Sequence, residues 1–243
     1  MKENNTKSPT SSKKSKSVTT KTPDLSRPVT MAQEAFYGLA GEVVRLIGPH
    51  SEADLAAILL QFLVAFANAI GRTAHGKVGH ILQYLVLFII LVGESAKARK
   101  GTAWTTVKQL FDEVGGQWLR TRLQGGLASG EGLIYAVRDP RNLSGPNGRP
   151  FRDPGATDKR LLVFEPEMAA VFRVARRDGN ILSTTLRQAW DGEPLGNLTK
   201  NEPSTATGAH ISLIGHITVS ELVKCLTGSE QSNGLANRFL WCR

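Results

Sequence analysis

The stretch from Leu85 to Thr106 reads LVLFIILVGESAKARKGTAWTT and divides into three parts with different patterns. An unbroken apolar run, Leu85–Val92, ends at Gly93, and a short basic turn follows it. Beyond the turn, apolar residues recur at helical spacing: Trp104, Val107, Leu110 and Phe111. A buried strand, a tight turn and a helix in this order are typical of a phosphate-binding loop. There the first N–H groups of the helix and the positive end of its dipole point toward the bound anion.

The turn contains the residue types that phosphate and its metal ion require. Gly93 and Gly101 allow the backbone to approach a ligand closely, and Ser95 or Thr102 could place a hydroxyl group on Mg²⁺. The cations of the turn would neutralise phosphate charge. We therefore expect a nucleotide site formed by Gly93, Glu94, Ser95, Lys97, Arg99, Lys100, Gly101 and Thr102.

Two alignments to the pattern G-x-x-x-x-G-K-[ST] are open. Counting from Gly93 places Ala98 at the second glycine and Arg99 at the lysine. Allowing one extra residue places Lys100 at the lysine, with Gly101 between it and Thr102. We prefer the second alignment, because a guanidinium does not replace the compact ammonium that fits between phosphates. The alternative is an ordinary strand-to-helix turn that happens to be basic.

Composition sets the broad class. The 243 residues are 41% hydrophobic and can form one large α/β domain or two small ones. Two cysteines, without metal-type spacing, predict a reducing, cytoplasmic compartment. Of the net charge of +9, residues 1–30 carry +5, from seven basic and two acidic residues. This distribution predicts nucleic acid as a polyanionic partner, and the alternative is a tail that only solvates the chain.

Three segments are expected along the chain: a disordered basic tail (1–28), a helical N-terminal unit (29–72) and an α/β core (80–243). Within the helical unit, Ser51 is the expected N-cap of a helix that ends at Ile70. The apolar segment Leu55–Ile70 is too short for a membrane span and contains Gln61 and Asn68, so we expect a buried helix and no membrane association.

Several connections are expected to lack regular structure. Residues 71–79 predict a loop, and the helix after the phosphate turn is expected to end at Gly115-Gly116, followed by a separate helix from Gln117. Residues 139–158 hold four prolines and predict a long surface loop. Its arginines make it a candidate nucleic-acid contact: Arg141, Arg149 and Arg152.

Residues 159–167, KRLLVFEPE, predict a buried strand with acids at its carboxyl end. Ligands gather at the carboxyl ends of parallel strands. Glu165 and Glu167 could therefore hold Mg²⁺ through water and orient or deprotonate an attacking water. The alternative for Glu167 is an acid that only favours a helix N-terminus. Leu195–Lys200 predicts a short edge strand.

The last clear strand is His210–Ile217, with His216 near its carboxyl end. His216 is either a sensor of the γ-phosphate or a packed core histidine. Ser229–Leu235 predicts a short helix and Ala236–Trp241 a strand. Arg238 at the start of that strand could reach a neighbouring subunit's phosphates, and the alternative is an ordinary surface arginine. Because the chain ends at Arg243 directly after that strand, we expect the core to be truncated there.

Taken in order, these segments resemble the RecA-like P-loop ATPases of plasmids, phages and integrated elements. That group includes RepA-like and DnaB-like hexameric helicase cores and their domain-of-unknown-function relatives, often linked to primase domains. The resemblance covers roughly residues 35–243 and rests on VLFIILVGESAKARKGT, ASGEGLIYAVRD, RLLVFEPEM and GAHISLIGHIT…GLANRFLW.

The resemblance implies an α/β RecA-like core with a mostly parallel sheet, binding of ATP and Mg²⁺, single-stranded DNA as partner, and a homo-oligomer, possibly a hexamer. It makes Lys100 and Thr102 the phosphate and Mg²⁺ residues, Glu165 and Glu167 the acidic pair, and His216 the sensor. Where the family has glycine before its lysine, this chain has Arg99. We therefore expect an ATPase that acts on DNA in the replication of a mobile element, or a non-catalytic DNA-binding accessory protein that keeps the fold.

Overall fold

The computed structural model describes residues 30–94, 99–144, 149–199, 203–225 and 234–243. Met31–Arg243 forms one compact unit, so the helices of residues 29–72 belong to the same unit as the core. The expected tail, 1–28, and most of the expected helix Ser229–Leu235 lie outside the described residues.

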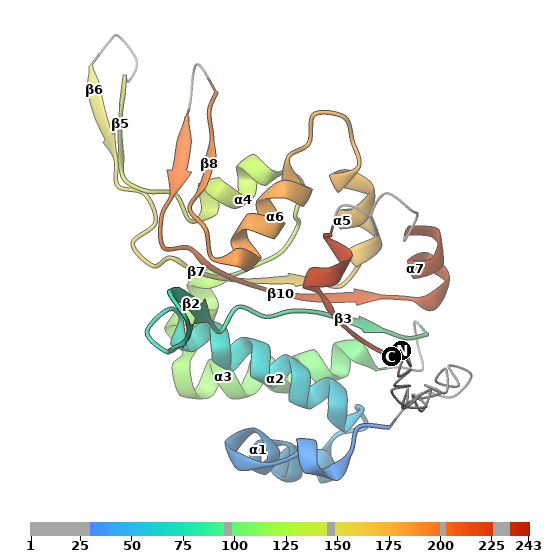
Figure 1. Ribbon diagram of the computed structural model, residues 1–243. Coiled ribbons are helices and arrows are strands. Elements are labelled where there is room, and N and C mark those ends of the chain that lie inside the picture. The colour runs from blue at the N-terminus through green and yellow to red at the C-terminus, as the bar shows by residue number, and fades with distance from the viewer. Residues whose placement is uncertain (1–29, 95–98, 145–148, 200–202, 226–233) are drawn as a thin grey trace, which may run out of the picture. The chain divides into compact units, whose positions relative to one another are not determined.

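A five-stranded parallel sheet forms the centre of this unit, in the spatial order β11-β3-β10-β7-β4 (Figure 1). Its strands are β3 (Phe88–Val92), β4 (Leu123–Gln124), β7 (Arg160–Glu165), β10 (His210–Ile217) and β11 (Leu240–Cys242). Every residue of β3 and β10 is buried, as expected for parallel strands that read as continuous apolar runs. The predicted α/β class, a parallel sheet flanked by helices, is confirmed.

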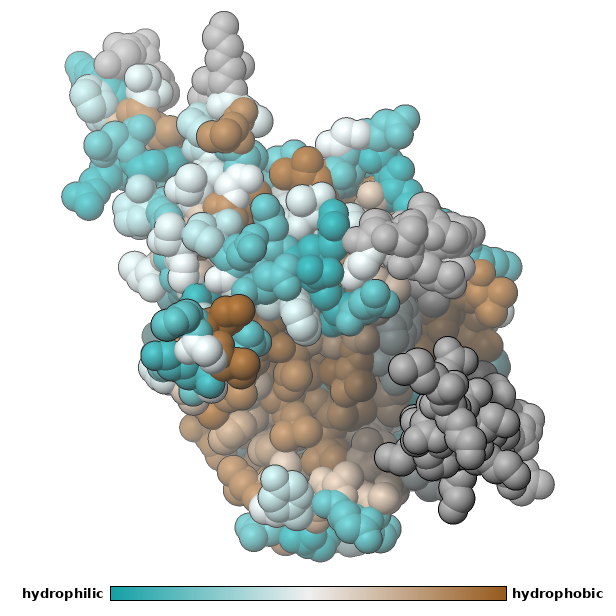
Figure 2. Space-filling view, viewed as in Figure 1, coloured by the Kyte–Doolittle hydropathy of each residue, from teal (hydrophilic) through white to brown (hydrophobic). Residues whose placement is uncertain are grey.

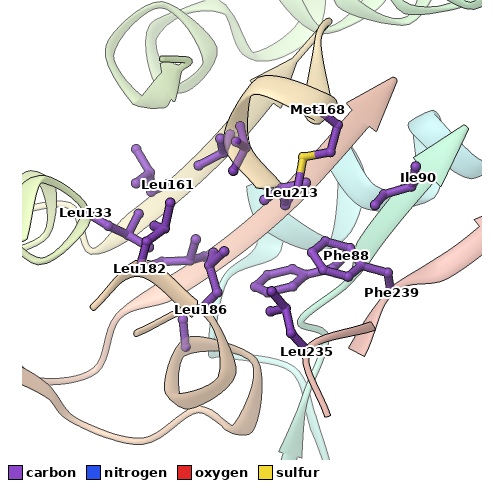
Figure 3. Close-up of a cluster of buried hydrophobic side chains, with 14 of the residues drawn as sticks. Phe88, Ile90, Leu133, Leu161, Met168, Leu182, Leu186, Leu213, Leu235 and Phe239 are labelled. Carbon is purple, nitrogen blue, oxygen red and sulfur yellow. The ribbon is translucent and has the colours of Figure 1, made fainter. Parts of the chain in front are cut away.

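Helices cover both faces of the sheet. One face carries α2 (Leu55–Ile70) and α3 (Lys100–Arg122), and α1 (Gly38–Ile47) packs on α2. The other face carries α4 (Gly130–Ala136), α5 (Met168–Ala175), α6 (Leu182–Asp191) and α7 (Val219–Cys225). Successive residues of β3 serve opposite faces: Ile89 and Leu91 contact the α2–α3 side, whereas Phe88 and Ile90 join the second cluster (Figure 3).

Three β-hairpins lie outside the sheet, and each directly precedes one of its strands. They pair β1 (His75–Val78) with β2 (Ile81–Tyr84), β5 (Arg141–Ser144) with β6 (Pro150–Asp153), and β8 (Leu195–Asn197) with β9 (Ser204–Ala206). The strands that follow them are β3, β7 and β10. Because each hairpin leads into the start of a parallel strand, all three emerge at the amino edge of the sheet.

The hairpins correct three expectations. Residues 71–79 and 139–158 are not plain loops, and the Leu195 strand pairs with β9 instead of joining the main sheet. The β5–β6 hairpin is held by ion pairs whose partners are 12 and 15 residues apart in the sequence. Asp153 in β6 accepts hydrogen bonds from Arg138 and Arg141. A hairpin held by such ion pairs has no local apolar pattern from which it could be predicted.

Two helix boundaries also differ from the prediction. The N-cap of α2 is Asp54, whose Oδ1 accepts from the N–H groups of Ala56 and Ala57, whereas Ser51 accepts only from Ala53. Helix α3 continues through Gly115-Gly116, although each glycine costs roughly 1 kcal/mol relative to alanine. Beyond the glycines, Trp118 and Leu119 are buried in the core, and this packing outweighs the propensity of the glycine pair.

Helix α2 is apolar on all sides but places two amides against the sheet. Gln61 and Asn68 are both fully buried. The Asn68 Nδ2 donates to the carbonyl oxygens of Leu161 and His210, each at 3.1 Å. The prediction that this segment is a buried helix is confirmed. Within the described residues, no helix combines the length and apolarity that crossing a bilayer would take.

Replacing Asn68 by alanine should destabilise the protein by about 2 kcal/mol, because the buried carbonyl oxygens of Leu161 and His210 lose a donor. The free energy of unfolding in urea measures this loss. The matched control is Gln83→Ala on the exposed hairpin strand β2, which should leave the midpoint nearly unchanged. A midpoint for Asn68→Ala equal to that of the wild type would contradict the account of α2 docking.

Candidate functional site

The sheet has a switch point between its neighbouring strands β3 and β10. The helix after β3, α3, covers one face, and the helix after β10, α7, covers the other. A crevice therefore opens where the carboxyl ends of these two strands meet, the place at which open α/β sheets bind ligands. The N–H of Gly93 donates to the carbonyl oxygen of Ile217 at 3.1 Å and joins the two strand ends.

A pocket of about 420 Å³ lies beside the carboxyl end of β3. Its volume is within the range of roughly 300–1,000 Å³ found for small-molecule sites. The lining comes from four separate segments: the loop before α2 and the start of α2, the end of β3, the start of α3, and the end of β11. These residues are Glu52, Ala53, Asp54, Ala57, Leu91, Val92, Gly93, Arg99, Lys100, Cys242 and Arg243.

Lys100, the first residue of α3, reaches back across the turn. Its Nζ donates to the carbonyl oxygen of Gly93 at 2.7 Å and to that of Glu94 at 3.3 Å. Partial burial lowers the pKa of Lys100, while the carboxylates of Glu94 and Glu221 act to raise it. Glu221 is held by Thr218 directly after β10, where the two residues form a capping box on α7. Backbone carbonyl groups therefore hold the Lys100 ammonium at the end of β3. An anionic ligand could replace these carbonyl groups as hydrogen-bond acceptors.

Two helices begin at this pocket, and their N-termini differ. The first turn of α2 is capped by Asp54, so two of its N–H groups already have a negative partner. At α3 the N-cap residue is Arg99, which gives the first turn no side-chain hydrogen bond. The 23-residue helix α3 thus directs its positive end and uncapped N–H groups toward the pocket that holds Lys100. Of the two helices that begin at this pocket, α3 is therefore the candidate for binding an anion.

Arg99 is strained. Its φ of +44° makes it the only non-glycine residue with positive φ in the described part of the chain. This left-handed conformation favours glycine, the residue that the resembled family has at this position. The side chain forms an ion pair with Glu52, which precedes α2.

The predicted acidic pair lies at the carboxyl end of β7 and directly beyond it, and β10 separates β7 from β3. Glu165 is buried, and its Oε1 accepts a hydrogen bond from the N–H of Leu127 at 2.7 Å. Glu167 is exposed at the N-cap of α5 and makes no capping hydrogen bond. Neither side chain lines the pocket at Lys100.

His216 is packed in the core, at 4% exposure. Its Nε2 lies 3.1 Å from the Oε1 of Gln61, and its ring is perpendicular to that of Phe164, with the two ring centroids 5.1 Å apart. Burial, with a further contribution from the charge of Lys100, lowers the pKa of His216 to about 4. The neutral imidazole thus lies near Lys100 but outside the pocket lining, an arrangement that fits the packed-core alternative.

The other predicted site residues divide into three groups. Gly93, Arg99 and Lys100 line the pocket together, whereas Glu94, Gly101 and Thr102 are exposed around it and do not line it. Ser95 and Lys97 lie outside the described residues. Arg238 is in a 3-10 turn and not in a strand, and its guanidinium donates to Asp191 Oδ2 at 2.7 Å.

Sequence reasoning missed the far side of the pocket. Glu52 and Asp54 precede the phosphate turn by about forty residues, and Cys242 follows it by more than a hundred and thirty. Asp54 carried a local signal, since aspartate directly before an apolar helix is a strong N-cap. No local pattern marks Glu52 or Cys242, because the packing of α2 and β11 brings them to the site.

Comparison with known proteins gives no family assignment. Neither a protein-family model nor a curated protein matches the chain. At the carboxyl end of β3, Lys100 and the N-terminus of α3 adjoin a pocket that is completed by residues of α2 and β11. This combination could hold an anionic group.

Arg99→Gly should be more stable than Arg99→Ala by about 1 kcal/mol, because both variants lose the ion pair with Glu52 and only alanine keeps the left-handed strain. Thermal or urea unfolding of the two variants measures the difference. At Lys108, an exposed position inside α3, the same pair of substitutions should give the opposite order. Equal stability of the two Arg99 variants would argue against strain at this turn.

The free energy of unfolding should fall as the pH is lowered from about 6.5 toward 4. Burial lowers the pKa of His210 and His216 to about 4, whereas the unfolded chain protonates both near 6.5. In this window the unfolded state binds more protons, so acid weakens folding by up to about 1.4 kcal/mol per pH unit for each histidine. Urea titrations across the window test this, and His216→Gln should reduce the slope.

The control for this slope is His80→Gln, an exposed histidine between β1 and β2. Its pH profile should match that of the wild type. Stability that does not change between pH 4 and 6.5 would refute the burial of neutral imidazoles.

Proposed function

We propose that this protein is a P-loop ATPase with a RecA-like core, related in function to helicases, that acts on DNA in the replication of a mobile element. The observation that carries the proposal is Lys100 at the N-terminus of α3, beside a pocket of about 420 Å³ at the carboxyl end of the parallel strand β3. A basic group, a helix N-terminus and a strand end in this relation are what the triphosphate of a nucleotide requires.

Binding would replace the carbonyl partners of Lys100 by phosphate oxygens. The ammonium and the N–H groups of the first turn of α3 would then neutralise and orient the terminal phosphates. ATP supplies the anhydride bond that is broken, and the protein contributes positioning and charge stabilisation. Thr102 in that first turn and Glu165 at the end of β7 are the proposed Mg²⁺ residues.

The proposed acid–base roles belong to β7 and β10. Because β10 lies between β3 and β7, His216 stands between the strand of the phosphate turn and that of the acidic pair. Glu165 would orient the attacking water, with Glu167 beside it at the start of α5. His216, neutral and fixed by Gln61, would act as a positioning residue beneath Lys100.

DNA and a second copy of the chain are the proposed partners. The basic residues of the tail favour a polyanion. Figure 2 shows a continuous apolar surface where α2 lies in Figure 1, and Leu55 of that helix is 42% exposed. Apolar surface of this kind commonly marks an interface, which favours a homo-oligomer. For Arg238 to serve a neighbour's phosphates, it would have to leave Asp191.

A second candidate is a DNA-binding accessory protein that keeps this fold without turnover. Two observations favour it: the left-handed strain at Arg99, where the resembled family has glycine, and the bond from Leu127 that already occupies Glu165. The two candidates differ in hydrolysis and share the nucleotide pocket.

Lys100→Ala should lower the affinity for ATP at least about tenfold, because it removes a charge-assisted hydrogen-bond donor worth roughly 1.5–3 kcal/mol. Glu165→Gln should keep binding and lose Mg²⁺-dependent phosphate release. Titration calorimetry and phosphate release, with and without single-stranded DNA, measure both effects.

The matched control is Lys108→Ala, which removes an exposed lysine from the same helix and should behave as the wild type. Binding without turnover in the wild type would select the accessory protein. An affinity for ATP that is undetectable, or equal in Lys100→Ala and Lys108→Ala, would overturn the nucleotide site.

A further inference from the structure

The amino edge of the sheet, opposite the pocket, carries two projecting arms. The hairpins β5–β6 and β8–β9 extend together from that edge (Figure 1). Arg141 of β5 joins them, because its Nη1 donates to the Oγ of Ser204 at 2.7 Å and to the carbonyl oxygen of Pro203 at 3.1 Å. Hydrogen bonds thus join the base of the β5–β6 arm to the turn end of strand β9.

A buried carboxylate holds the base of the β5–β6 arm. Asp153, 5% exposed, accepts two hydrogen bonds from Arg138, one from Arg141 and one from the N–H of Gly155. The hydrogen bond from Arg138 and its partners keep the pKa of Asp153 far below the ordinary value, so the network stays ionised. Gly155 has a φ of +67°, and a Cβ there would lie 2.6 Å from the backbone of Asp139. The arm therefore leaves the core on a fixed support.

The outer part of the arm is basic and aromatic. Arg149 and Arg152 are exposed, and Phe151 between them is 56% exposed. Among the residues that the structure describes, neither arginine has a hydrogen-bond or ion-pair partner. Leu198, on the neighbouring arm, is fully exposed. Asp153 is the one carboxylate in the described residues of the two arms, and its charge is already used by Arg138 and Arg141.

We infer that the β5–β6 arm binds single-stranded nucleic acid, with a base stacked on Phe151 and phosphates at Arg149 and Arg152. Free cations attract a polyanion, and an exposed ring beside them offers a platform for an unpaired base. A duplex hides its base faces and would leave Phe151 unused. The inference takes from the proposed function only that the nucleic acid is DNA, and it does not require ATP binding.

Fluorescence anisotropy of the full chain with a labelled oligothymidine tests the arm directly. Phe151→Ala should lower the affinity about tenfold, and Phe151→Trp should retain or raise it. Arg149→Ala and Arg152→Ala should each weaken binding and reduce the slope of log affinity against log salt by about 0.7. Since all variants share the basic tail, differences between them report on the arm.

Matched controls lie away from the arms. Tyr37→Ala removes an aromatic ring that is 80% exposed before α1, and Arg120→Ala removes an exposed arginine of α3. Neither should change the affinity for the single strand. Circular dichroism of Phe151→Ala should match the wild type, since the ring is exposed.

Three results would overturn the inference: equal affinity of Phe151→Ala and Tyr37→Ala for the oligonucleotide, tighter binding of the matching duplex than of the single strand, or no binding of either. Equal affinity of the two variants is also the result expected if Phe151, Arg149 and Arg152 contact a protein partner instead. Failure of this inference can be distinguished from failure of the proposed nucleotide site. Lys100→Ala should bind the oligonucleotide normally without ATP, and Phe151→Ala should bind ATP normally.

Discussion

The seating of α2 on strand β10 is the constraint on which the rest of the structure depends. Gln61 meets His216 near the carboxyl end of β10, and seven residues later Asn68 reaches the carbonyl oxygen of His210 at its amino end. An apolar helix could slide along an apolar strand at little cost, whereas two buried amides allow one register. That register places Asp54, the N-cap of α2, in the wall of the pocket.

Further hydrogen bonds hold the C-terminal end of α2 at the amino edge of the sheet. At the amino edge, His210 bonds to the carbonyl oxygen of Ala67, and Arg160 of β7 donates to that of Ala69. His210 and Arg160 thus provide hydrogen-bond partners for carbonyl groups in the last turn of α2. Helix α2 is therefore held at its middle by His216 and in its last turn by His210 and Arg160. Its N-terminus lines the same pocket as the start of α3.

The parts of the fold that were predicted are those with a strong local pattern. The apolar runs that form β3, β7 and β10, and the turn at Gly93, follow from short stretches of sequence. The hairpins could not be predicted in this way, because their strands have only three or four residues each and long-range contacts hold them. Lys100 was predicted at the phosphate turn, and it lines the pocket as the first residue of α3. Glu52 reaches the same pocket only through the packing of α2.

Several features that are locally unfavourable occur together at the turn before α3. Asp54 and Thr218 cap helices that begin at the same edge, yet α3 has no side-chain cap from its N-cap residue. The positive φ of Arg99 adds a cost of roughly 1–2 kcal/mol at that residue. A separate conflict, the glycine pair inside α3, is offset by the burial of Trp118 and Leu119. Natural proteins keep backbone strain where function requires it. The strain at Arg99, its lack of a side-chain cap hydrogen bond and a half-buried ammonium occur together at one strand end. A bound anion, as proposed above, would interact favourably with both the helix end and the ammonium.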